Sequence, residues 1–137
     1  MPNNLQAIGS LAGRVLLALI FIISGVSKIG SYEATVSYMQ SYGLPGLLLP
    51  FTIALEVLGG LAIAIGWQTR YAALLLAGFT IAAAVVFHSN FGDQNQIIHF
   101  MKNLAITGGL LTLAANGPGR IALSFDRDER SRVLSAL

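Results

Sequence analysis

Residues 47–67 read LLLPFTIALEVLGGLAIAIGW, and this apolar stretch decides the fold. It is 21 residues long and has one charged side chain, that of Glu56, near its middle. A helix rises about 1.5 Å per residue, so the stretch can cross a hydrocarbon core of about 30 Å. The pattern therefore predicts a transmembrane helix that holds a carboxyl group near the centre of the bilayer. A charge at that depth costs several kcal/mol, so we expect a cationic partner, a bound proton or water beside it.

The composition of the whole chain indicates a membrane protein. Hydrophobic residues make up 55% of the 137 residues and charged residues only 10%, with a mean hydropathy of +0.71. Soluble domains have about 25% charged residues, so this chain has too little polar surface for a soluble globule. We expect one integral membrane domain over residues 1–137, embedded in the lipid bilayer. With a net charge of only +2, the basic residues are expected to set the membrane orientation and not to bind nucleic acid.

Three further apolar runs, residues 11–29, 71–88 and 97–115, resemble the opening stretch in length. Together the four runs predict an all-α fold, a four-helix transmembrane bundle. The first run is not interpreted as a signal peptide, because no basic residue precedes Arg14 and no A-x-A-like cleavage site is present. Gly59 and Gly60, one turn after Glu56, would let a neighbouring helix approach the carboxyl group closely. Residues 120–137 contain three acids and four arginines, and we expect them to form a cytoplasmic surface tail.

The segment between the first two runs, residues 30–46, has the features of a short interfacial helix. Ser31 is placed to cap such a helix, and Glu33 would lie in its first turn. The aromatic side chains of Tyr32, Tyr38 and Tyr42 suit a membrane surface, where an apolar ring meets water. We expect this helix to lie over one mouth of the bundle. An ordinary loop is an equally good interpretation of the same residues.

The basic residues fall unequally on the two sides of the predicted bundle. Cytoplasmic loops of membrane proteins carry an excess of lysine and arginine. We therefore expect both termini in the cytoplasm and residues 30–46 outside, which an even number of spans allows. The bias is six to two: Arg14, Arg70, Arg120, Arg127, Arg130 and Arg132 on one side, and Lys28 and Lys102 on the other.

Helical spacing brings the intramembrane polar residues onto a few faces. Arg14 and Lys28 share one face of the first run, together with Ala18, Phe21 and Gly25, and this face should point into the bundle. In the fourth run, Lys102 and Asn103 lie on one face with His99 and Ile106. Lys102 is four residues from the centre of its run, about 6 Å in depth, so we expect it to pair with Glu56. Arg14 is the second candidate. The pair could be functional, or it could only fix the register of the helices.

The two histidines are weaker signals. His88 closes the third run and His99 lies near the same outer surface, so either could carry protons or simply face water. A metal site is not expected, because the chain has no cysteine and few carboxylates near these histidines. The absence of cysteine also excludes disulfides, cysteine-ligated iron–sulfur or zinc sites and c-type haem attachment within the chain.

Several segments of the chain resemble the DoxX family of small bacterial inner-membrane proteins. They are RVLLALIFIISGVSKIG (14–30), YGLPG (42–46), ALEVLGGLAIAIGWQTR (54–70) and FMKNLAITGGLLTLAANGPGR (100–120), with His88 between the last two. The resemblance implies a four-helix inner-membrane protein, and some relatives are linked to quinone-reducing oxidoreductases, including thiosulfate–quinone types. Most members have no established activity. Recurrent polar positions of the family match Arg14, Lys28, Glu56, His88, Lys102 and Asn103. Beyond residue 120 the chain reads IALSFD, which departs from the short ending usual in the family.

Two classes of function fit these residues, and the sequence identifies no catalytic residue. In the first, the chain is a membrane subunit of a quinone-linked oxidoreductase. Glu56, Lys102, Asn103 and His88 would supply hydrogen bonds and protons to the quinone, and a soluble or membrane redox partner would supply the electrons. In the second, the chain is a non-catalytic binder of a lipid or small molecule, or an assembly factor. The sequence leaves open whether the chain forms a homo-oligomer.

Overall fold

A computed structural model of the protein describes residues 2–123 and shows an all-helical fold. Four helices are long and apolar enough to cross a membrane, which confirms the predicted four-helix transmembrane bundle. The elements of the described residues are α1 (Pro2–Gly30), α2 (Tyr32–Ser41), the 3-10 turn η1 (Gly46–Leu48), α3 (Leu49–Ile65), α4 (Thr69–Phe87) and α5 (Gln94–Asn116).

The observed helices differ from the predicted spans mainly at the first one. The expected range was 11–29, whereas α1 begins at Pro2, because a proline at the start of a helix is favourable and no second proline interrupts the helix. The other three spans agree within a few residues at each end. The chain stops being helical at Asn116, where Gly117 takes a positive φ of 80° and Pro118 follows. Of the predicted tail, residues 124–137 lie outside the described part of the chain.

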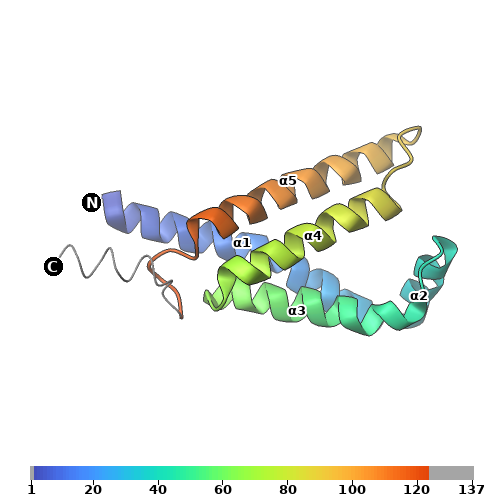
Figure 1. The fold of residues 1–137 in the computed structure, drawn as a ribbon, viewed down its shortest axis with the longest axis horizontal. Helices are drawn as coiled ribbons and strands as arrows, with labels where there is room; N and C mark the ends of the chain where they lie inside the picture. The colour runs from blue at the N-terminus through green and yellow to red at the C-terminus, as the bar shows by residue number, and fades with distance from the viewer. Residues whose placement is uncertain (1, 124–137) are drawn as a thin grey trace.

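The bundle consists of two helix pairs. Helix α1 packs along α3, α4 packs along α5, and the contact between α3 and α4 joins the two pairs. The pairs cross near one end and diverge toward the other, where α2 lies across the opening (Figure 1). The core at the crossing is built from small and aliphatic side chains such as Ala18, Ile63, Leu76 and Leu110, all fully buried. The divergence leaves space at the α2 end of the bundle.

Two glycines set the close contact between α1 and α3. A Cβ atom on Gly60 would lie 2.8 Å from Ile22 of α1, and one on Gly25 would lie 2.6 Å from Val57 of α3. Either methyl group would force the helices apart. As expected from the sequence, Gly60, one turn after Glu56, lets a neighbouring helix approach closely. That helix is α1.

Residues 117–123, here called the strap, close the end of the bundle opposite to α2. The guanidinium group of Arg14 donates hydrogen bonds to the carbonyl oxygens of Pro118, Ile121 and Ala64. The amide of Leu123 adds a bond of 3.0 Å to the carbonyl of Ile65. Because Arg14 belongs to α1 and Ala64 to α3, one buried side chain fastens the strap to two helices.

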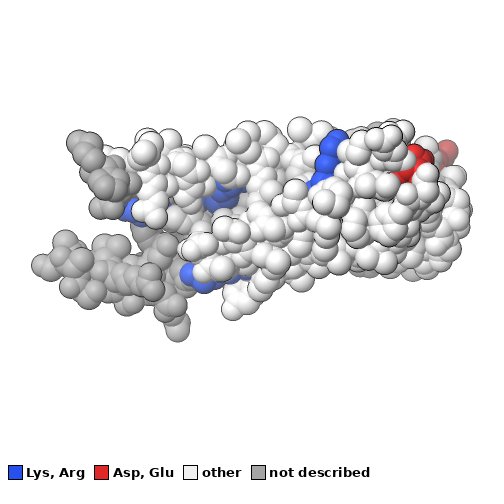
Figure 2. Space-filling model, turned by 90° about the horizontal axis from the view of Figure 1, so that it is seen from above, with Lys and Arg blue, Asp and Glu red and all other residues white. Residues whose placement is uncertain are grey.

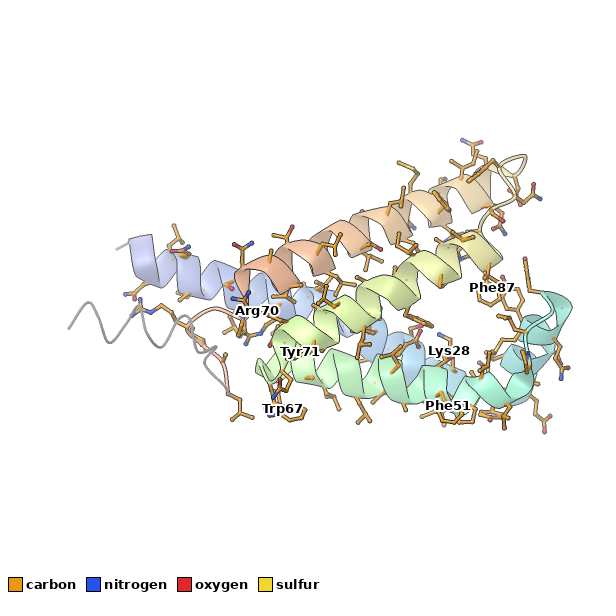
Figure 3. All side chains as sticks on the ribbon, viewed as in Figure 1. Lys28, Phe51, Trp67, Arg70, Tyr71 and Phe87 are labelled. Carbon is orange, nitrogen blue, oxygen red and sulfur yellow. The ribbon has the colours of Figure 1, made fainter. Side chains whose placement is uncertain are left out.

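The charged side chains differ between the two ends. Most of the basic groups in view lie toward the end that carries the strap, one lies nearer the middle of the molecule, and the acidic groups gather at the far end (Figure 2). Arg70 of α4 also lies at the strap end (Figure 3), where it donates to the carbonyls of Ala114 and Ala115 and so caps α5. The acids at the other end are Glu33 in the first turn of α2 and Asp93 at the N-cap of α5.

Candidate functional site

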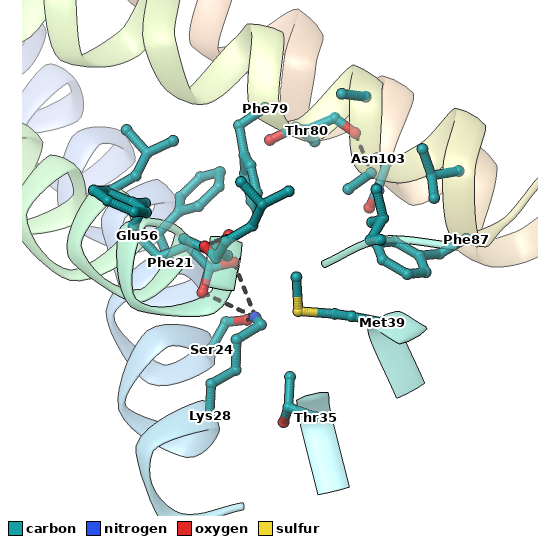
Figure 4. Close-up of a pocket in the computed structure, with 18 of the residues that line it drawn as sticks. Phe21, Ser24, Lys28, Thr35, Met39, Glu56, Phe79, Thr80, Phe87 and Asn103 are labelled. Carbon is teal, nitrogen blue, oxygen red and sulfur yellow. Dashed lines mark hydrogen bonds and ion pairs between the residues drawn. The ribbon is translucent and has the colours of Figure 1, made fainter. Parts of the chain in front are cut away.

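A cavity of about 570 Å³ occupies the space where the two helix pairs diverge. Every helix contributes to its wall, and α2 covers its end (Figure 4). The wall is mainly apolar and aromatic, with Phe21, Met39, Phe79 and Phe87 among its side chains. A cavity of this size and lining is typical of a small-molecule site.

An ion pair between α1 and α3 forms one wall of the cavity. The ammonium group of Lys28 donates to both carboxylate oxygens of Glu56, at 3.0 and 2.9 Å, and to the hydroxyl of Ser24 at 2.8 Å. The Glu56 side chain is 4% exposed and that of Lys28 is 25% exposed. The lysine is therefore the member of the pair that a molecule in the cavity can reach.

The expected pairing of Glu56 with Lys102 is wrong, and so is the second candidate, Arg14. Lys102 is exposed on α5, and Arg14 lies at the strap end. The close contact of α1 with α3 places Lys28 beside Glu56 although it lies near the end of its helix, because the lysine stem spans the difference in depth.

Asn103 lies on the wall opposite Lys28 (Figure 4), and its side-chain amide donates to the carbonyl of Thr80 at 3.4 Å. The Thr80 hydroxyl donates to the carbonyl of Leu76 in its own helix, 2.6 Å away. Asn103 is partly buried and borders the cavity. The two walls thus present one ammonium group and one amide group to a mainly apolar space.

His88 lies at the α2 end of the cavity. It is the C-cap residue of α4, and its Nδ1 atom lies 3.1 Å from the side-chain oxygen of Gln96. Its ring stacks on that of His99 with 5.0 Å between centroids. His88 borders the cavity, whereas His99 is exposed. The pair therefore links the cavity to the surface of the protein by two titratable rings.

Aromatic contacts hold α2 over the cavity. Phe87 lies at the end of α4 (Figure 3). Its ring centroid is 5.3 Å from that of Tyr38 and 5.0 Å from that of Tyr42. Met39 of α2 is buried and lines the cavity. The predicted helix between the first two spans is thus present, with Glu33 in its first turn. The expected cap is not made, because the Ser31 hydroxyl donates to the carbonyl of Ser27.

The cavity gathers four of the six polar residues that the sequence singled out: Glu56, Lys28, Asn103 and His88. The shared face of α1 is also as predicted, since Arg14, Ala18, Phe21 and Gly25 are all buried. Sequence reasoning missed Ser24 and Thr80 and the aromatic lining. Ser24 precedes Lys28 by one helical turn, and this spacing was the signal that could have identified it.

Comparison with known proteins agrees with this architecture. A sequence model of the DoxX family matches residues 9–89. The chain is 49% identical to the inner membrane protein YqjF of Escherichia coli K12 over 125 residues, which cover 91% of this chain and 95% of YqjF. It is 40% identical to the inner membrane protein YphA of the same organism, over 85% of this chain and 87% of YphA.

A third relative carries the name of an enzyme. "Putative oxidoreductase CatD" of Bacillus subtilis 168 is 34% identical over 112 residues, which cover 77% of this chain and 84% of CatD. No solved structure matches the chain. The family match and the two inner-membrane relatives agree with the four membrane-spanning helices. The protein is therefore a multi-pass inner-membrane protein that belongs to the DoxX family.

Proposed function

We propose that the cavity binds a quinone, and that the chain is the membrane subunit of a quinone-linked oxidoreductase. The observation that carries this proposal is a mainly apolar, aromatic cavity with two hydrogen-bond donors on opposite walls, each donor belonging to a membrane-spanning helix. A quinone is complementary to this cavity. It is a flat apolar ring with a carbonyl oxygen, a hydrogen-bond acceptor, at each end. The ring suits Phe79 and Phe87, and the oxygens suit Lys28 and Asn103.

The polar groups also suit the proton chemistry of a quinone. Reduction to the quinol adds two electrons and two protons, one to each carbonyl oxygen. Lys28 can turn the N–H that it donates to Ser24 toward one quinone oxygen while its two bonds to Glu56 hold the ammonium group in place. His88 can exchange protons with the surface through His99. A redox partner protein delivers the electrons in this proposal. The name of CatD supports an oxidoreductase role in the family.

Quantifying the quinone in purified protein tests the proposal. The protein is extracted from its native membrane in mild detergent, and quinones are measured in a solvent extract against protein concentration. We expect close to one quinone per chain, lost in Ala83→Leu, which fills the cavity. Ala115→Leu is the matched control, because Ala115 is exposed on α5 away from the cavity. If the extract contains a bound lipid and no quinone, the non-catalytic binding role replaces the proposed redox role. If it contains neither, both roles are contradicted.

The orientation in the membrane is part of the same proposal. We propose that the strap end faces the cytoplasm and that α2 faces the opposite side, because three of the five basic residues in the described range, Arg14, Arg70 and Arg120, lie at the strap end. Reporter fusions at residues 38 and 137 should give opposite signals, with the C-terminal one cytoplasmic. If the reporter at residue 137 gave the signal of a position outside the cytoplasm, the orientation would be the reverse of the proposed one.

A further inference from the structure

Lys102 is a charged side chain in a membrane-spanning helix, and no residue in the described range 2–123 pairs with it. The carboxylate of Glu56, its expected partner, is already bonded to Lys28 through both oxygens. Lys102 itself is exposed on α5. An ionisable group inside a membrane is costly and nearly always has a partner, so its countercharge must come from outside the described chain.

The depth of Lys102 argues against a lipid headgroup as that partner. Helix α5 spans Gln94–Asn116, so Lys102 is three residues, about 4.5 Å, from its midpoint. With α5 centred in the bilayer, the headgroup level lies about 15 Å from the middle of the hydrocarbon core. A lysine stem reaches about 6 Å, which leaves the ammonium group about 4–5 Å short of that level. A countercharge in the plane of the membrane is therefore the better match.

The residues that follow Lys102 on its face of α5 suit contact with another helix. Ala105 and Gly109 follow it at i+3 and i+7, on the same face of α5, and both are exposed. Within 4 Å, a Cβ atom built on Gly109 would meet only Leu17, at 3.7 Å or more. By contrast, the exposed face of α1 presents large aliphatic side chains such as Leu16 and Ile23. Small residues let a second helix come close enough for van der Waals packing.

Within residues 2–123, no acid of a second copy of this chain is placed to provide the countercharge. In a symmetric pair of α5 helices, Lys102 would face another Lys102, and like charges repel. Among the described acids, Glu56 is buried and paired, while Glu33 and Asp93 lie outside the membrane-spanning helices. We propose that the face of α5 formed by Lys102, Ala105 and Gly109 binds a transmembrane helix of another protein, which has an aspartate or glutamate at the depth of Lys102. This proposal does not depend on the ligand of the cavity.

Site-specific photo-crosslinking in the native membrane tests this interface. A benzophenone amino acid replaces Ala105, and the matched control replaces Leu16, which is exposed on α1. We expect a protein crosslink from position 105 and none above background from position 16. Mass spectrometry of the crosslinked peptide should identify an apolar helix that contains an acidic residue. Crosslinks to lipid only, to this same chain, or to a helix without an acid overturn the proposal.

Variants of Lys102 then test the charge itself. Lys102→Met should lower the crosslink yield about tenfold, and Lys102→Arg should keep it, since the positive charge remains. Lys102→Glu should abolish the crosslink, and changing the partner's acidic residue to lysine should restore it. The purified Lys102→Met protein should unfold at the wild-type temperature, because no described residue bonds to Lys102. Failure of the charge exchange, or a clear loss of stability in the purified protein, overturns the proposal.

Discussion

Each end of the bundle holds a cationic side chain within the protein, but the two cations donate to different kinds of hydrogen-bond acceptor. At the strap end, Arg14 is 3% exposed and donates only to backbone carbonyl oxygens. At the α2 end, Lys28 is one-quarter exposed and bonds to side chains at the edge of a cavity. Backbone acceptors move only together with their segment of the chain, so the strap end is a structural closure. Side-chain acceptors can rearrange, so the cavity end can exchange partners with a ligand.

The largest effect is expected at the ion pair of the cavity end. Lys28→Met leaves the carboxyl group of Glu56 buried without its partner, which should cost about 3–5 kcal/mol. Glu56→Gln should cost less, because Lys28 is more exposed and water in the cavity can hydrate it. The double variant should be more stable than Lys28→Met alone. Unfolding of the four proteins in detergent measures these differences.

The same cycle separates stability from function. If the pair only fixes the helix register, the double variant should recover stability and quinone content together. Under the proposed function, stability should return while quinone content stays low. Strictly additive losses of the two single variants would show that the residues are not coupled, contrary to their direct contact.

A smaller loss is expected at the strap end. Arg14→Met removes the donor of three carbonyl groups, of which those in the strap can turn toward water. The loss should be about 2–3 kcal/mol, since a buried acceptor left unpaired costs about 1–3 kcal/mol. Quinone content should stay at the wild-type level, because the cavity is at the other end. Loss of quinone at unchanged stability would contradict the division between a structural end and a binding end.

The close contact between α1 and α3 predicts that a single added methyl group lowers the stability by an intermediate amount. Gly60→Ala would place a Cβ atom 2.8 Å from Ile22 and so separate α1 from α3, at a cost of about 1–2 kcal/mol. Gly78→Ala is the matched control, since a Cβ atom there meets nothing within 4 Å. The control should be neutral or slightly stabilising. Equal losses in both variants would show that helix packing at Gly60 is not the cause.

The smallest change in stability is expected for His88→Ala. This residue follows the last turn of α4, and its side chain contacts Gln96 and the ring of His99. The change in unfolding free energy should be within about 0.5 kcal/mol, as for substitutions away from a packed core. Exchange of the bound quinone with its reduced form should become slower if His88 carries protons. A loss of stability as large as that of Lys28→Met would make His88 a structural residue.

Much of the bundle follows from the sequence alone. The four apolar runs predicted the spans, and the spacing of Arg14, Ala18, Phe21 and Gly25 predicted the buried face of α1, which is observed. These features depend on one helix at a time, where period and length decide the result. The need of Glu56 for a partner was also clear, because a mid-membrane charge is costly wherever its neighbours lie.

The identity of that partner could not be obtained in the same way. Matching depths favoured Lys102, but depth says nothing about which helices are neighbours. The contact of α1 with α3 through Gly25 and Gly60 decides the pairing, and it depends on the shapes of two helices at once. The strap was missed for a similar reason. Every residue has a backbone carbonyl group, so the sequence does not show which carbonyl oxygens bond to Arg14.

The bonds of Arg14 have a consequence for the order in which the chain matures. Its partners at Pro118 and Ile121 are 104 and 107 residues further along the sequence. During synthesis, the first helix must therefore wait for almost the whole chain before its guanidinium group is satisfied. Until residue 121 has left the ribosome, this end of the nascent protein remains open. Truncation before the strap would thus yield a protein with all four spans but with the first one poorly anchored.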